Sequence, residues 1–140
     1  MFKNNAITKT LEILYSHPDF VNSPTINIDV FQDLRASIGD DLGFSDLVTI
    51  YLSSAEALIE SIQAAFDTQD AIKFNMGVHS LKSTSASIGA IKLSQICRYL
   101  EKISKAGEIM VSSEFLDLIS NEHEQVIAAI QNCILEFMTE

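Results

Sequence analysis

The apolar residues of this 140-residue chain recur at three- and four-residue steps over most of its length, a spacing typical of amphipathic α-helices. The longest stripe runs from Leu47 to Phe66, and Ser45 is its predicted N-cap. Asp70 is the predicted N-cap of the next helix, and Gly89 its C-terminal stop. The apolar face of that second helix is formed by Phe74, Val78, Leu81, Ser85 and Ile88.

Two more long helices are predicted in the second half of the chain, one ending at Gly107 and one starting at Ser113. Their apolar stripes contain Leu93, Ile96, Leu100 and Ile103 in the first, and Leu116, Ile119, Val126, Ile130, Cys133 and Phe137 in the second. No stretch has the alternation of a strand. Four long helices with short connections predict an all-α protein, an antiparallel up-down four-helix bundle.

The first 28 residues have a different pattern, and we expect one or two short additional helices at this end of the chain. Residues 7–15 have helical spacing, Pro18 ends that helix, and residues 22–24 form a connector. Asp29 then has the position of an N-cap, with Gln32 completing a capping box, for a short helix closed by residues 39–41. We therefore divide the chain into an N-terminal helix and connector, 1–28, and a bundle domain, 29–140.

Composition narrows the possible environments and partners. Nine basic and nineteen acidic residues give a net charge of −10, which repels nucleic-acid backbones and anionic lipid surfaces. No apolar run approaches membrane-spanning length, and the N-terminus lacks the apolar core of a signal peptide, so we expect a soluble, cytoplasmic protein. Cys97 and Cys133 lie within apolar periodic segments and are predicted to be buried free thiols.

The chemistry-bearing residue of the second long helix is His79. At about 100° per residue it lies opposite the core stripe, on the same side as Asn75, Met76, Lys82, Ser83 and Ala86. The imidazole should therefore project from the bundle among small or flexible neighbours. The next helix carries a second polar stripe, formed by Arg98, Glu101 and Lys105.

The run from His79 to Ala90, HSLKSTSASIGA, resembles the signature of histidine phosphotransfer (HPt) domains, the phosphocarriers of two-component signalling. The family's run reads His-x-Leu-Lys-Gly-Ser, followed by small residues and Gly-Ala. The resemblance covers residues 29–107, and it implies the same four-helix fold. Ser83 stands where the family usually has Gly. This departure could narrow partner choice, slow transfer, or provide a hydrogen bond to the phosphoryl group.

The resemblance implies that His79 is the phospho-acceptor. Glu101 matches a family residue that accepts a hydrogen bond from Nδ1–H, which leaves Nε2 as the nucleophile. Lys82, Ser83, Arg98 and Lys105 would lie near the phosphoryl group. The implied partners are response-regulator receiver domains and a (hybrid) histidine kinase. We expect them to dock on Met76 and on the apolar residues Phe31, Leu34 and Ile38 of the short helix.

The resemblance implies no cofactor or metal held by the chain itself. The sequence has no Gly-rich phosphate loop and none of the boxes of an ATP-binding kinase domain, so we expect no kinase activity of its own. It also lacks an obvious acidic cluster, so Mg²⁺ should come with the receiver. His17 and His123 have no partners at metal-ligand spacing and are predicted to be structural or solvent-exposed.

Two other interpretations remain open at this stage. The chain could be a receiver-binding helical adaptor that has lost phosphotransfer, with Ser83 as the sign of that loss. It could also be an HPt module excised from a larger hybrid histidine kinase. We expect a monomer, with a dimer possible through the N-terminal segment.

Overall fold

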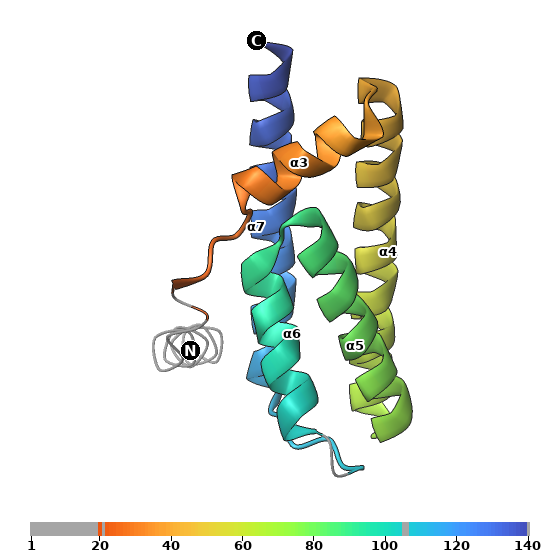
Figure 1. The fold of residues 1–140 in the computed structure, drawn as a ribbon. Helices are drawn as coiled ribbons and strands as arrows, with labels where there is room; N and C mark the ends of the chain where they lie inside the picture. Colours follow the sequence, from red (N-terminus) through yellow and green to blue (C-terminus); the bar gives the residue numbers. More distant parts are fainter. Residues whose placement is uncertain (1–19, 21, 105–106, 140) are drawn as a thin grey trace.

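The computed structural model describes residues 20, 22–104 and 107–139, which form five α-helices and no strand. The predicted fold class is confirmed: four helices form the bundle and one shorter helix precedes them (Figure 1). The N-terminal helix predicted over residues 7–15 lies outside the described residues. The five helices are α3 (Ile28–Ile38), α4 (Asp41–Asp67), α5 (Ala71–Ile88), α6 (Ile91–Ile103) and α7 (Ser113–Met138).

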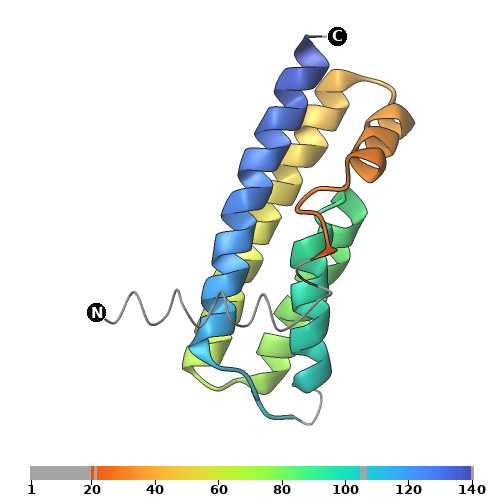
Figure 2. The same cartoon turned by 90° about the vertical axis from the view of Figure 1, so that its left-hand side faces the viewer.

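The four bundle helices differ in length, and α3 fills the resulting gap. Helices α4 and α7, of 27 and 26 residues, extend beyond the hairpin formed by the shorter α5 and α6. Figures 1 and 2 show α3 lying across the protruding ends of the long pair. An aromatic cluster fixes it there, because the Phe31 ring lies 5.1 Å from that of Phe44 and 5.9 Å from that of Phe137. The Arg35 guanidinium covers the Phe137 ring at 4.1 Å.

This packing corrects one predicted docking residue. Phe31 is completely buried under α3, between α4 and α7, so the prediction that it contacts a partner is wrong. The helical pattern placed Phe31, Leu34 and Ile38 on one stripe and left open which of them faces solvent. Leu34 and Ile38 are half-buried against the core.

Two predicted helix starts are also wrong. The N-cap of α3 is Asn27, whose side chain accepts a hydrogen bond from the Val30 amide, so Asp29 lies within the first turn. The N-cap of α4 is Asp40, which accepts from the Gly43 amide at 2.7 Å, well before Ser45. In both places an Asn or Asp upstream of the predicted cap satisfies the free amides of the first turn. The predicted starts at Asp70 and Ser113 are confirmed.

The turn between α5 and α6 depends on Gly89, which ends α5 as predicted. Its φ of +92° is a left-handed conformation, and a Cβ there would lie 3.0 Å from the Asn27 carbonyl oxygen. The Asn27 amide donates to the Gly89 carbonyl at 2.8 Å, so the start of α3 is bonded directly to this turn. Helix α6 ends at Ile103 rather than near Gly107.

The core runs the length of the bundle and contains the predicted apolar stripes. Cys97 and Cys133 are buried free thiols, as predicted. Helices α4 and α5 approach closely at Gly77, where a Cβ would lie 2.8 Å from Cγ1 of Ile62. The buried hydroxyls of Tyr51 and Ser85 form a 2.9 Å hydrogen bond across the same helix pair. Burial raises the pKa of Tyr51 to about 12.

By length and composition alone, α4 is sufficiently long and apolar to cross a membrane, which corrects the statement that no run approaches that length. The core helix of a soluble protein can meet the same criterion; α4 contributes Phe44, Val48, Tyr51, Ala55, Ile62 and Ala65 to the core, and 22% of its apolar window is buried. The absence of a membrane partner remains a prediction.

Helix α7 buries a histidine without a hydrogen-bond partner. Both ring nitrogens of His123 are buried and unpaired among the described residues, so of its two predicted roles the structural one is correct. Burial lowers its pKa below the ordinary value of 6.5, against an opposing effect of Glu56 and Glu124. His17 lies outside the described residues.

We expect His123→Phe to raise the free energy of unfolding by about 1 kcal/mol, because a buried polar ring without a partner is replaced by an apolar one. The gain should grow as the pH falls below 6.5. In that range His123 binds a proton more readily in the unfolded chain than in the folded one, and this difference destabilises the wild type but not the variant. Urea denaturation at several pH values measures both effects. Equal pH dependence of the two proteins would contradict the burial of a neutral His123.

Candidate functional site

His79 lies at the middle of α5 and points away from the core. Its side chain is 63% exposed, whereas Val78 and Leu81 beside it are completely buried. The Asp70 N-cap and the Gly89 stop set the ends of the helix, and the core residues set its rotation. The imidazole is therefore presented to solvent from the middle of a helix that is capped at both ends.

Glu101 of α6 holds the imidazole in place. One carboxylate oxygen, Oε2, lies 2.6 Å from Nδ1 of His79, and the other, Oε1, accepts a hydrogen bond from Nζ of Lys82 at 2.8 Å. An ionised carboxylate can only accept, so Nδ1 carries the proton of this contact. In the neutral ring the Nε2 lone pair is then free toward solvent.

The environment keeps Glu101 ionised. The Lys82 ammonium is the main cause that holds the pKa of Glu101 below its usual range, and the hydrogen bond from His79 acts in the same direction. Partial burial of the carboxylate opposes both. The three side chains therefore form a charged, hydrogen-bonded group that spans α5 and α6.

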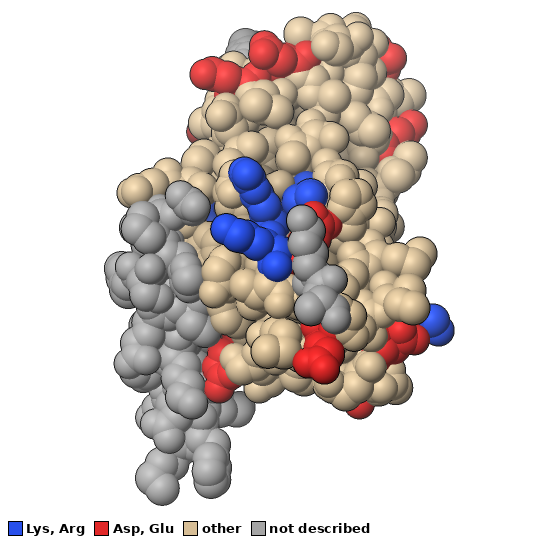
Figure 3. Space-filling model, turned by 60° about the horizontal axis from the view of Figure 1, so that its bottom comes forward, with Lys and Arg blue, Asp and Glu red and all other residues tan. Residues whose placement is uncertain are grey.

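Basic residues are concentrated on these two helices. Residues 71–103 carry five basic side chains and a single acidic one, a net charge of +4 in a chain whose total is −10. Figure 3 shows most of the visible Lys and Arg side chains gathered in one group on the surface. The five basic residues are Lys73, Lys82, Lys92, Arg98 and Lys102. This local charge favours an anionic group or an acidic partner surface.

The structure also locates the other predicted site residues. Ser83 is exposed one turn after His79 on α5, and Arg98 is exposed one turn before Glu101 on α6. Met76 is 65% exposed, one turn before His79. Lys105 lies outside the described residues.

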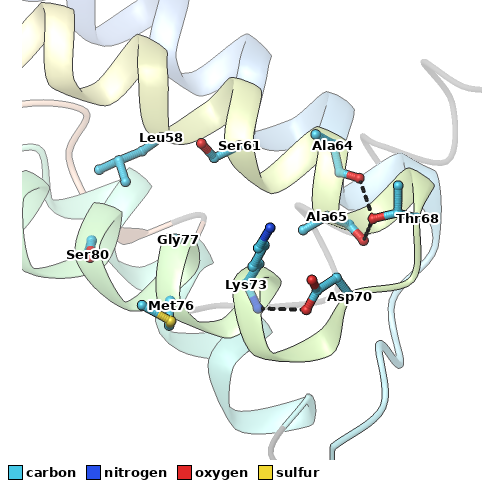
Figure 4. A pocket seen from close by; sticks show the side chains of 10 residues that line it. All are labelled: Leu58, Ser61, Ala64, Ala65, Thr68, Asp70, Lys73, Met76, Gly77 and Ser80. Atoms are coloured by element: carbon cyan, nitrogen blue, oxygen red, sulfur yellow. Dashed lines mark hydrogen bonds between the residues drawn. The ribbon is translucent and has the colours of Figure 1, made fainter.

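Two hollows lie along the seam between α4 and α5, one beside residues 73–80 of α5 and one beside residues 84–88. The larger, about 510 Å³, is lined by Lys73, Met76, Gly77 and Ser80 from α5, and Figure 4 shows the Lys73 side chain extending toward α4. The smaller, about 290 Å³, is mainly apolar and lies where α3, α4 and the end of α5 meet. Its walls are formed by Leu34, Leu47, Ile50, Tyr51, Ser54, Thr84, Ser87 and Ile88. Of these, sequence reasoning identified only Leu34 as a surface residue.

Sequence reasoning also missed Ser94 and the link from Asn75 to Ser104. Ser94 Oγ donates to the Lys82 carbonyl at 2.9 Å, and Asn75 Nδ2 donates to the Ser104 carbonyl at 3.0 Å. Ser94 and Ser104 are buried. The only signal available was a small polar residue next to the apolar stripe of α6. No group of three His, Cys, Asp or Glu side chains suited to a metal ion is found in the described part of the chain.

Comparisons with known proteins agree on one family and one fold. The family model described as Hpt domain matches residues 46–129, more than half of the chain. A crystal structure of histidine-containing phosphotransfer protein B from Pseudomonas aeruginosa PAO1 has a TM-score of 0.71 at 24% identity, covering 80% of this chain and 96% of that one. A comparison with curated protein sequences finds no match.

Two plant proteins have the same fold. A putative histidine-containing phosphotransfer protein from rice has a TM-score of 0.70 at 22% identity, and the match covers 98% of this chain and 97% of that one. Histidine-containing phosphotransfer protein ZmHP2 from maize has a TM-score of 0.68 at 22% identity, with 91% and 96% covered. At these identities the likeness establishes the fold, and the family assignment rests on the sequence match.

We expect Lys82→Met to raise the pKa of Glu101 toward its ordinary value of 4.5, because the main cause of the depression is removed. His79→Gln should raise it less. Lys102→Met, which removes a nearby exposed charge, is the control and should leave it nearly unchanged. Carboxyl carbon NMR during a pH titration measures all three. A Glu101 pKa that is the same in Lys82→Met and in the wild type would contradict the ion pair.

Proposed function

Since the chain belongs to the Hpt domain family, we propose that it carries a phosphoryl group on Nε2 of His79 between the aspartates of receiver domains in a multistep phosphorelay. The observation that carries this proposal is the 2.6 Å contact between Nδ1 of His79 and Glu101 at an exposed position of α5. The contact supports the tautomer in which Nε2 is the nucleophile.

The transfer requires no proton movement at the histidine. The Nε2 lone pair attacks the phosphorus of a phospho-aspartate, an N–P bond forms, and the acyl-phosphate O–P bond breaks. The electron pair of the broken bond leaves with the aspartate carboxylate. Nδ1 keeps its proton throughout, and the positive charge that develops on the ring is stabilised by Glu101 at 2.6 Å. The reverse sequence delivers the phosphoryl group to the next receiver.

Basic residues near His79 compensate the charge of the phosphoryl group. Lys82 is one turn from the histidine, and its ammonium is already held on this face by Glu101 at 2.8 Å. Arg98 is exposed on the same stripe of α6, and Lys105 continues that stripe in sequence. A phosphohistidine carries about two negative charges, which favours positive partners of this kind. In this proposal Mg²⁺ is bound by the receiver, and this chain has no cofactor and no kinase activity of its own.

The proposed docking surface lies beside His79 on α3, α4 and α5. The apolar hollow of about 290 Å³ is lined by Leu34 of α3 and by residues 84–88 of α5, which follow His79 along the helix, and the half-buried Ile38 is one turn after Leu34 on α3. Met76 extends the surface on the other side, with a flexible thioether that suits varied partners. We expect a small, transient interface, on the order of 1,000 Å² in total. The kinase of the relay would dock through its own receiver.

Two further possibilities, an adaptor that binds receivers without transfer and a module of a hybrid kinase, concern the same surface. The adaptor would have lost transfer, with Ser83 as the sign of that loss, whereas His79 is 63% exposed and hydrogen-bonded through Nδ1. This arrangement favours the carrier. Whether the chain acts alone or within a longer protein does not alter the proposed chemistry.

We expect His79→Gln to abolish labelling by a phosphorylated receiver domain, while helical circular dichroism and the melting temperature stay nearly unchanged, because the side chain is largely exposed. The matched control is His123→Phe, which replaces a buried histidine of α7 and should keep the label. The measurement is acid-labile, base-stable label on this chain. Label that persists in His79→Gln would exclude His79 as the acceptor.

Ser83 tests how closely a receiver must approach. If a small residue serves only to give access, Ser83→Gly should transfer at least as fast as the wild type and lose up to about 1 kcal/mol of stability, because Gly is the poorer helix former. Ser83→Gln should block transfer in a folded bundle. If the hydroxyl instead bonds the phosphoryl group, Ser83→Gly and Ser83→Ala should both be slow. Rapid transfer by Ser83→Gln, measured by quench-flow labelling, would disprove both explanations.

A further inference from the structure

Helices α5 and α6 are joined by a ladder of three polar links that lie along their antiparallel seam. Asn75 Nδ2 donates to the Ser104 carbonyl at 3.0 Å at one end, and Ser94 Oγ donates to the Lys82 carbonyl at 2.9 Å at the other. Between them, Glu101 contacts His79 and Lys82. The two outer links each involve one side chain and one backbone carbonyl, so they fix the backbones of the two helices relative to each other.

Several contacts fix the position of α6 along α5. The two-residue turn at Gly89 and the hydrogen bond from the Lys92 amide to the Pro24 carbonyl, 3.0 Å, hold its N-terminal end. Its apolar side chains pack closely against the core. The links made by Ser94 and Asn75 add directional hydrogen bonds beyond the turn, where Ser94 and Ser104 are buried and Asn75 is half-buried.

The two outer links of the ladder lie on either side of the contacts that Glu101 makes with His79 and Lys82. Ser104 is the C-cap of α6, less than one turn after Glu101, and Asn75 is one turn before His79. At the other end, Ser94 bonds the carbonyl of Lys82 itself, the second partner of Glu101. A slide of α6 by even part of a turn would carry the Glu101 carboxylate away from Nδ1 of His79.

We propose that Asn75 and Ser94 are positioning residues that hold α6 in the register at which the Glu101 carboxylate reaches Nδ1 of His79. The inference builds on the proposed function, because the tautomer they enforce is the one that leaves Nε2 free for the phosphoryl group. Neither residue contacts the imidazole. They act through the position of Glu101, in the way that outer residues orient the ligands of other reactive sites.

The test compares Asn75→Ala and Ser94→Ala with Ser85→Ala. Ser85 is the matched control, because it is also a buried serine of this bundle with one hydrogen bond, but its partner is Tyr51 on α4 rather than a group across the α5–α6 seam. Nitrogen-15 NMR of the His79 ring, at a pH where the imidazole is neutral, reports which nitrogen carries the proton. Glu101→Ala gives the reference spectrum of a ring without its acceptor, and Ser94→Thr keeps the hydroxyl.

We expect Asn75→Ala and Ser94→Ala to move the ring nitrogen shifts toward those of Glu101→Ala and to slow phosphoryl acceptance about tenfold. Ser94→Thr should restore both, and Ser85→Ala should change neither at a similar loss of melting temperature. Wild-type nitrogen shifts in Asn75→Ala and Ser94→Ala would overturn the proposal, and so would an equal shift in Ser85→Ala. If the shifts move as expected but the wild type accepts no phosphoryl group, the positioning role stands and the proposed function fails.

Discussion

The site depends on one carboxylate shared between two helices. Glu101 of α6 contacts Nδ1 of His79 at 2.6 Å and Nζ of Lys82 at 2.8 Å, and both partners lie on α5. The contact requires α5 and α6 to pack closely at a fixed register. The rest of the fold serves that requirement: Gly89 makes the tight turn between them, and the start of α3 is hydrogen-bonded to that turn. Helices α4 and α7 supply the core against which the hairpin packs.

The net charge of helices α5 and α6 is opposite in sign to the net charge of the whole chain. An overall charge of −10 would repel a phosphoryl group, yet α5 and α6 together carry +4. The single acidic residue of these two helices is the one that orients the imidazole, and its charge is offset by Lys82. All the other acidic residues of the sequence lie outside residues 71–103. An acidic chain therefore contains one locally basic pair of helices, which would attract the proposed phosphoryl group.

Much of the architecture could be predicted from the sequence, because the helical periodicity of the core residues is long and regular. The exposure of His79 followed from its place opposite Val78 and Leu81, and the stop at Gly89 followed from its conformational freedom. Helix starts were less predictable, since Asn27 and Asp40 compete as caps with polar residues a few positions later. The burial of Phe31 depends on the crossing of α3 over α4 and α7, and no local pattern encodes that contact. The links made by Asn75 and Ser94 likewise depend on the register of two helices.

If Glu101 occupies Nδ1 of His79, Nε2 is the atom that carries the phosphoryl group. Phosphorus–nitrogen correlation NMR of the chain after phosphorylation by a receiver domain tests this most directly, because it identifies the bonded atom. We expect a single phosphoryl group, on Nε2 of His79, with Nδ1 still protonated. A phosphoryl group on Nδ1, or on any other residue, would contradict it.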